Sequence, residues 1–153
     1  MARNYKKYII YQKSYKLVIT LYKITDKFPA HEINNITNQI RRSAVSVPLN
    51  IAEGSAKKSS REFLNFLNIA YGSAKELAVL LDLSKDLGYI RKKDHSKVSN
   101  QLDVLNKKIF LFIRHLEKEH IGSSFFQKYN LRKDIEKEKD LLYSTLSNNN
   151  LNK

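Results

Sequence analysis

The chain has 153 residues, no cysteine, and 28 basic against 15 acidic side chains, which gives a formal net charge of +13. This length predicts one domain with its own core, and the lack of cysteine excludes disulfides and thiolate metal ligands. No apolar run approaches the length of about 18 residues that a membrane-spanning helix needs, and segment 1–16 lacks a signal-peptide core, so we expect a cytoplasmic protein.

Helices are the expected secondary structure throughout. Four glycines and two prolines leave few turn signals, and no alternating apolar run is bounded by turn residues on both sides. The basic excess is uneven, since segment 1–27 has a net charge of +6 and segment 91–120 one of +4. Such an excess favours a polyanionic partner, most often nucleic acid. The alternative is the lysine-rich composition that accompanies an AT-rich genome.

The first predicted helix covers about residues 11–26. Two neighbouring stripes make its apolar face wider than a single bundle seam requires. The first stripe contains Ile10, Leu17, Leu21, Ile24 and Phe28, and the second contains Tyr11, Tyr15, Val18, Tyr22 and Thr25. Phe28 precedes Pro29, which disfavours further helix and ends the element.

A second helix is predicted to follow from residue 33 or 34, with Pro48 inside it. Its apolar stripe consists of Ile33, Ile36, Ile40, Ala44, Val47 and Ile51. Because the stripe continues past Pro48, we expect a kink there and not a break. Gly54 is the predicted stop.

The same helix carries a polar stripe about 100° from the apolar one. Its members are Gln39, Arg42, Ser46, Asn50 and Glu53. Either it forms a hydrogen-bonded seam with a neighbouring helix or it is an ordinary solvated face. Glu53 and Glu76 could also face each other as an acid–base pair. We favour a structural polar network of Gln39, Ser46, Asn50, Glu53 and Glu76, with Arg42 as the partner of the carboxylates.

The third helix has a capping box at its start, formed by Ser59 and Glu62, and Gly88 at its end. Its predicted core face contains Phe63, Phe66, Leu67, Ala70, Ala74, Leu77 and Leu81. The small residue Gly72 suggests that a second face meets another subunit. Asp94 is the predicted N-cap of the fourth helix. That helix has a seam of Val98, Leu102, Leu105, Ile109, Phe112 and Leu116, which suits an antiparallel bundle.

These elements predict an all-α, up-and-down antiparallel four-helix bundle over residues 1–122. Residues 123–153 are a C-terminal extension, for which a short helix and disorder remain equally open. The region also resembles a known family. The segment QIRRSAVSVPLNIAEG, preceded by KFPAHE and followed by REFLNFLNIAYGSAKEL, is similar to the four-helix-bundle family encoded in intervening sequences of 23S ribosomal RNA genes. The resemblance covers about residues 11–118 and extends to the accessory protein of diversity-generating retroelements. It implies a ring-forming homo-oligomer, a pentamer, that binds nucleic acid and has no catalytic activity.

The search for catalytic chemistry is negative. No glycine-rich phosphate loop is present, His31-Glu32 lacks the second histidine of a metalloprotease helix, and no histidine is spaced to meet a serine. His95 has no evident partner. We therefore expect no enzyme activity, no metal, no cofactor and no small-molecule substrate.

Basic side chains near aromatic ones are the candidate nucleic-acid contacts. We select Lys6, Lys7, Arg41, Arg42, Lys57, Lys58, Arg61, Arg91, Lys92 and Lys93, and expect the residues from Arg41 to Arg61 to cluster around the end of the second helix. Tyr5, Tyr8 and Tyr11 either stack on unpaired bases or pack on the bundle. Any binding should be electrostatic and sensitive to salt.

Three functions therefore remain open. The first is a non-enzymatic nucleic-acid-binding oligomer with RNA or DNA as its partner. The second is a protein-interaction adaptor that presents one face to a nucleic-acid enzyme such as a reverse transcriptase. The third is a structural oligomer without a polyanionic partner.

Overall fold

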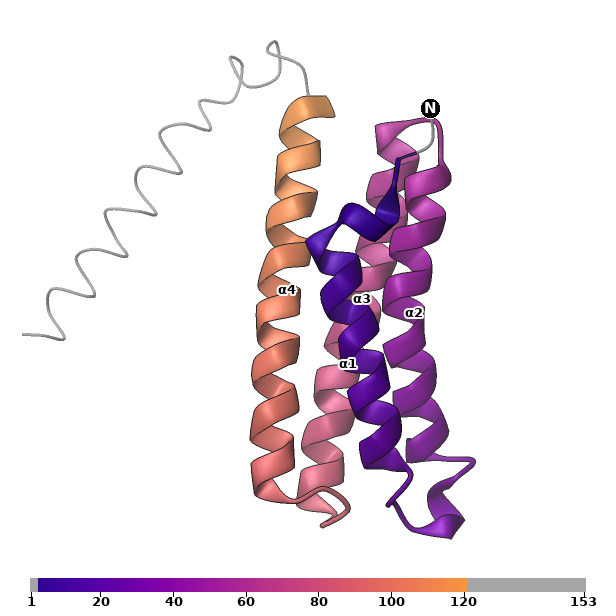
Figure 1. Cartoon of the computed structure of the whole chain (residues 1–153), viewed down its shortest axis with the longest axis vertical. Helices are drawn as coiled ribbons and strands as arrows, with labels where there is room; N and C mark the ends of the chain where they lie inside the picture. The colour runs from indigo at the N-terminus through magenta and orange to yellow at the C-terminus, as the bar shows by residue number, and fades with distance from the viewer. Residues whose placement is uncertain (1–2, 121–153) are drawn as a thin grey trace, which may run out of the picture. The chain divides into compact units, whose positions relative to one another are not determined.

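The computed structural model describes residues 3–120, and residues 3–117 form a compact unit. Four helices build this unit, as predicted: α1 (Ile9–Thr25), α2 (Ile36–Ala56), α3 (Ser60–Asp86) and α4 (Lys92–His120). Two short 3₁₀ turns, η1 (Tyr5–Lys7) and η2 (Ala30–Glu32), precede α1 and α2. The four helices lie side by side and the chain reverses direction at each connection (Figure 1). The predicted extension 123–153 lies outside the described residues.

The bundle has two ends, which carry different parts of the chain. At the N-terminal end, the first residues meet the α2–α3 connection, and Arg3 N–H donates to the Ser55 carbonyl at 3.3 Å. The opposite end holds the α1–α2 and α3–α4 connections (Figure 1).

Local signals define both ends of α3. The Ser59 hydroxyl accepts from the Glu62 amide at 3.1 Å and the Glu62 carboxylate accepts from the Ser59 amide at 3.3 Å, so the capping box is confirmed. Gly88 follows the helix with φ of 77°, a conformation that glycine adopts without strain. The predicted N-cap of α4 is wrong. The helix begins at Lys92, so Asp94 lies in its first turn, where it accepts from Arg91 at 2.9 Å.

One apolar core runs through the unit, and its members follow the predicted stripes with few exceptions. Ile33 is 57% exposed because it lies in the turn before α2 and not on the helix. On α4, Ile113 is buried while Phe112 is only partly buried and packs beside Tyr8 and Phe63. The buried apolar side chains of α2 and α3 are Ile40, Ala44, Val47, Ile51, Phe63, Leu67, Ala70, Ala74, Leu77 and Leu81.

Helix α2 continues through Pro48, as its uninterrupted apolar stripe predicts, and the kink there stays a prediction. Gly54 does not stop the helix, which continues to Ala56. Its role is contact with α3. A Cβ atom at Gly54 would lie 2.6 Å from the Phe66 Cβ and 2.7 Å from the Phe63 Cδ2. Such distances are far below van der Waals contact, so only glycine allows α2 and α3 to approach this closely here.

We expect Gly54→Ala to lower the free energy of unfolding by up to about 2 kcal/mol. Overpacking costs about 1–3 kcal/mol in a filled core, and a gain of about 1 kcal/mol in helix propensity offsets part of that cost. Urea denaturation measures the change. Gly72→Ala is the matched control, because a Cβ at Gly72 meets no atom within 4 Å, so that variant should gain stability. Equal gains from the two substitutions would contradict the close contact.

We also expect Ser59→Ala to destabilise the protein by about 1 kcal/mol at neutral pH, since it removes an N-cap. The hydrogen bonds from Ser59 lower the pKa of Glu62, so their contribution is present above the unfolded pKa and is lost as pH falls through the folded pKa. The difference in the free energy of unfolding between the variant and the wild type should therefore become smaller at acid pH. Urea denaturation at pH 7 and near pH 3 measures it, and a difference independent of pH would contradict this account.

Candidate polyanion-binding site

Part of the polar stripe of α2 forms hydrogen bonds with α3. Gln39 donates to Glu76, and the Ser46 and Ser73 hydroxyls lie 2.8 Å apart. Asn50 donates to the carbonyl and the hydroxyl of Ser46 at 2.8 and 3.0 Å, within α2. The seam that we favoured is present at Gln39 and Ser46, whereas Arg42 and Glu53 of the same stripe are exposed to solvent.

Glu53 and Arg42 do not take the places that we expected for them in this network. Glu53 lies beside Gly54, which packs on Phe63 near the start of α3, whereas Glu76 lies more than three turns further along α3. The antiparallel register therefore keeps the two carboxylates apart, and Glu53 accepts from Lys57 at 3.4 Å instead. Arg42 is exposed on the outer side of α2.

Arg41 connects α1 and α2. Its guanidinium donates to the Asp26 carboxylate at 2.6 Å and to the Thr25 hydroxyl at 2.9 Å, and it lies 4.8 Å from the centre of the Tyr22 ring. Its side chain is only 24% exposed. These contacts use the charge and the stacking face of Arg41 within the fold, so it has little left to offer an external phosphate.

The ten selected basic residues do not form one cluster. Arg41 and Arg42 lie sixteen and fifteen residues before Lys57, or about 22–24 Å along the helix, so the expected grouping of these side chains around the end of α2 is wrong. The other eight members divide between the two ends of the bundle. Lys6, Lys7, Lys57, Lys58 and Arg61 lie at the N-terminal end, and Arg91, Lys92 and Lys93 at the opposite end.

Aromatic side chains at the N-terminal end are packed on the bundle. The Tyr8 ring lies 6.0 Å from Phe63 and 5.1 Å from Phe112, and burial raises the pKa of its hydroxyl. Tyr5 makes an edge contact with Tyr11 at 4.8 Å. Arg3 completes this end by donating to the Lys57 carbonyl at 2.9 Å and lying over the Phe63 ring at 5.2 Å. These contacts favour the packing role of the tyrosines over base stacking.

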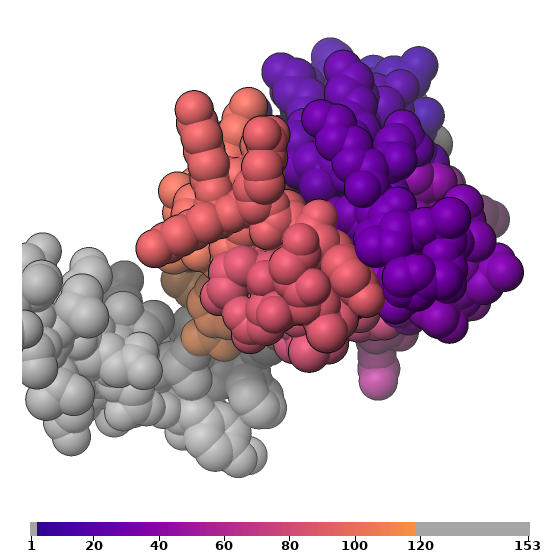
Figure 2. Space-filling view, turned by 90° about the horizontal axis from the view of Figure 1, so that it is seen from below, coloured from indigo at the N-terminus to yellow at the C-terminus, as the bar shows by residue number. Residues whose placement is uncertain are grey.

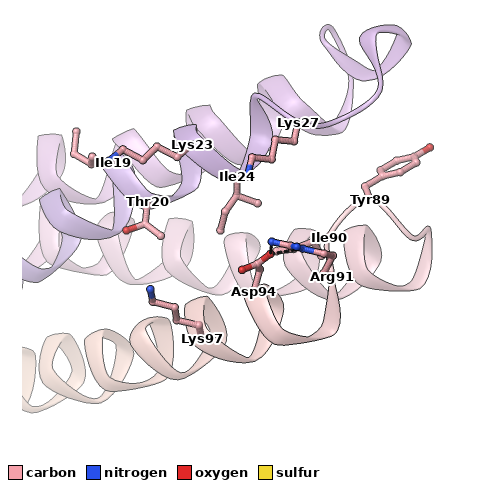
Figure 3. Close-up of a pocket in the computed structure, with 10 residues that line it drawn as sticks. All are labelled: Ile19, Thr20, Lys23, Ile24, Lys27, Tyr89, Ile90, Arg91, Asp94 and Lys97. Atoms are coloured by element: carbon pink, nitrogen blue, oxygen red, sulfur yellow. Dashed lines mark hydrogen bonds and ion pairs between the residues drawn. The ribbon is translucent and has the colours of Figure 1, made fainter.

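A cavity of about 620 Å³ opens between α1 and α4 at the opposite end. Its walls bear Lys23 from α1, Lys27 from the turn after α1, Arg91 from the residue before α4, and Lys97 from α4. Ile24 points between the two helices and, with Ile90, gives the cavity an apolar floor (Figure 3). Asp94 is the single carboxylate in the lining, and it is paired with Arg91 at 2.8 Å.

The three lysines of this cavity have no ion-pair partner among the described residues. Their charges are therefore uncompensated. The lining has four basic groups and one acidic group, in a recess where charge acts more strongly than on an open surface. At this end, long side chains from the start of α4 also project into the solvent beside the end of α1 (Figure 2). The arrangement can bind an anion with several oxygens, such as a phosphate group.

Our selection of single residues missed Lys23, Lys27 and Lys97. The net charge of whole segments could have indicated them, because the basic excess is greatest in the segments of the first and the fourth helix. An up-and-down bundle makes these two helices neighbours, which brings both excesses to one groove.

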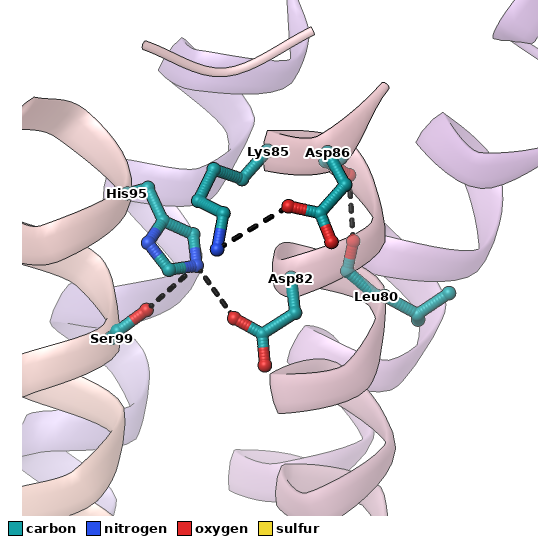
Figure 4. Close-up of polar contacts among 7 residues, drawn as sticks. Leu80, Asp82, Lys85, Asp86, His95 and Ser99 are labelled. Carbon is teal, nitrogen blue, oxygen red and sulfur yellow. Dashed lines mark hydrogen bonds and ion pairs between the residues drawn. The ribbon is translucent and has the colours of Figure 1, made fainter. Parts of the chain in front are cut away.

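A histidine, an aspartate and a serine meet between α3 and α4. His95 Nε2 lies 2.8 Å from the Asp82 carboxylate and 3.3 Å from the Ser99 hydroxyl, which corrects our expectation that no histidine meets a serine (Figure 4). Both contacts use the same ring nitrogen. A catalytic relay needs the two nitrogens in separate roles, so this grouping fastens two helices and is not a triad.

The described part of the chain has neither a candidate metal site nor a candidate membrane span. No group of three metal-ligating side chains occurs in it. Likewise, within residues 3–120 no helix has the length and the apolar character to cross a membrane.

Comparisons with known proteins agree with this fold. The chain resembles a solved structure of a protein with unknown function from the S23 ribosomal protein family of Bacteroides thetaiotaomicron VPI-5482, with a TM-score of 0.62 and 25% identity over 69% of this chain and 98% of that one. No curated protein matches the chain. Residues 6–110 match the family described as 23S rRNA-intervening sequence protein. Since this match covers more than half of the sequence and the four helices form the bundle that the resemblance implies, the chain belongs to the 23S rRNA-intervening sequence protein family.

Proposed function

We propose that the protein is a non-enzymatic nucleic-acid-binding protein that holds the phosphate backbone of RNA or DNA in the cavity between α1 and α4. The observation that carries the proposal is the set of unpaired lysines there, Lys23, Lys27 and Lys97, around an apolar floor. Flexible lysine side chains suit phosphates of varying position better than one fixed small ligand.

Binding of this kind depends on the release of counterions. Each phosphate that a lysine or arginine neutralises contributes about −0.7 to the slope of log affinity against log salt for a single strand, and about −0.9 for duplex DNA. Contacts to phosphates carry no sequence information. The complex should therefore be strongly salt-dependent and nearly indifferent to sequence.

Charge reversal at the cavity tests the proposal. We expect Lys23→Glu with Lys97→Glu to lower the affinity for a labelled single-stranded RNA roughly tenfold or more, and to make the salt slope less negative by about 1.4. Lys58→Glu with Arg61→Glu at the N-terminal end is the matched control, because it changes the net charge equally. Fluorescence anisotropy over a salt series measures both variants.

Two outcomes would count against the cavity. Equal losses from the two double variants would mean that only the overall charge matters. No binding by the wild type at low salt would remove nucleic acid as a partner. Recovery of a nucleic-acid enzyme with the wild type from the source cells would then support the adaptor reading.

We further propose that the protein assembles into a homo-oligomer, a ring of five subunits in keeping with the resemblance, through the outer face of α2. Two apolar side chains support this surface: Leu49 is 61% exposed, and Val45 lies beside it along the same groove of about 690 Å³. Isolated exposed leucines are common on protein surfaces, but a groove with several apolar residues marks an interaction site more often.

We expect Leu49→Glu to break the assembly into chains of 17.9 kDa, because it places a charge in the interface. Light scattering coupled to size exclusion measures the molar mass. The control is Leu87→Glu, since Leu87 is 56% exposed after the end of α3 and lies outside the groove. A wild type that is already a single chain, or a Leu49 variant that stays assembled, would overturn this interface.

A further inference from the structure

A second groove lies on the other side of α4, between α3 and α4. It has a volume of about 250 Å³ and is lined by Tyr71, Lys75, Asp103, Asn106, Lys107 and Phe110. The cavity described above is lined by different residues, from α1, the α3–α4 connection and the start of α4. The two sites can therefore be altered separately.

Two aromatic rings form the apolar part of this groove. The centre of the Phe110 ring lies 6.4 Å from that of Tyr71, and Phe110 is 48% exposed. Lys75 holds its ammonium group 5.2 Å from the Tyr71 ring centre. A planar ring can stack on the free face of Phe110 while Lys75 and Lys107 stand beside it as cations.

Asn106 is the unusual residue of the groove. It is 6% exposed in a position otherwise suited to an apolar side chain, and its Oδ1 has no hydrogen-bond partner among the described residues. An unsatisfied buried amide oxygen costs stability and calls for an explanation. The terminal torsion of asparagine is soft, so the amide can turn towards the groove and offer both a donor and an acceptor.

From these contacts we propose that the groove binds one unpaired nucleobase of a single-stranded nucleic acid. The base stacks on Phe110, its polar edge meets the Asn106 amide, and the flanking phosphates meet Lys75 and Lys107. The groove is smaller than the roughly 300–1,000 Å³ typical of small-molecule sites, which suits one ring and not a whole cofactor. This inference rests on the proposed function and deepens it, because it makes unpaired bases part of what the protein recognises.

The test compares an oligothymidylate of ten nucleotides with an abasic strand of the same length, which keeps the phosphates and lacks the bases. Stacking on an aromatic side chain strengthens binding roughly 5- to 150-fold per base. We expect the wild type to prefer the oligothymidylate by a factor in this range. Phe110→Ala should abolish the preference and leave binding of the abasic strand unchanged. Leu111→Ala is the matched control, since Leu111 is 65% exposed on the same helix and does not line the groove.

Asn106→Leu tests whether the Asn106 amide binds a base or is only an unsatisfied group in the core. The variant removes the unsatisfied oxygen at nearly constant volume, so it should raise the urea midpoint in either case. If the amide binds a base, the preference for the oligothymidylate falls at the same time. A more stable variant with an unchanged preference would overturn the role of Asn106.

The other outcomes are distinct. Equal, salt-dependent binding of both strands by the wild type would overturn the base site and leave the proposed function standing. No binding of either strand would overturn both. If Phe110→Ala lowers the molar mass of the protein while the preference persists, the groove is an interface between subunits and the proposal is wrong.

Discussion

The close contact between α2 and α3 is the constraint on which the bundle depends. Gly54 lets the two helices meet near the α2–α3 connection, and the hydrogen bonds of Gln39 and Ser46 continue the contact along their length. Apolar packing alone tolerates small shifts between helices, but a row of paired polar groups defines one register. With α2 and α3 fixed in this way, α1 and α4 cover the remaining sides of the core.

The different roles of the two helix pairs match the distribution of the net charge. The pair of helices that is tied by hydrogen bonds spans a nearly neutral part of the sequence, since residues 28–57 have a net charge of +1 and residues 58–90 a net charge of zero. The two covering helices carry the excess. In the function that we propose, a polyanion would meet a bundle with one cationic side, and the neutral side would be free for contacts between like chains, which would otherwise suffer charge repulsion.

Much of the fold could be predicted from the sequence because its determinants are local. The capping box at Ser59, the glycine after α3 and the apolar stripes all act within a few residues. Gly54 was misread as a helix stop because its importance comes from Phe63 and Phe66, which lie across the interface. The partner of Glu53 was misassigned for a related reason, since the antiparallel register decides which residues face each other.

The residues of the candidate site were harder to predict than the fold, because tertiary structure alone brings them together. Lys23 and Lys97 are each unremarkable on their own helices, and only the adjacency of α1 and α4 makes them a site. Arg41 shows the opposite. We selected it as a nucleic-acid contact from the sequence, but in the structure its guanidinium donates to Asp26 and links α1 to α2. The contact of His95 with Ser99, one helical turn away, could have been predicted from their spacing in the sequence. Its contact with Asp82 could not, because Asp82 lies on another helix.

The contacts of Arg3 have a consequence for the order in which the bundle assembles. They join the chain start to Lys57 and Ser60, across 54 and 57 residues, while α2 and α3 are joined by a connection of only a few residues. Closing a short loop costs less entropy than closing a long one, so the α2–α3 hairpin is expected to form early and the Arg3 contacts late. Contacts that form late are expected to open readily, so amide exchange in residues 3–8 should be faster than within α2 and α3.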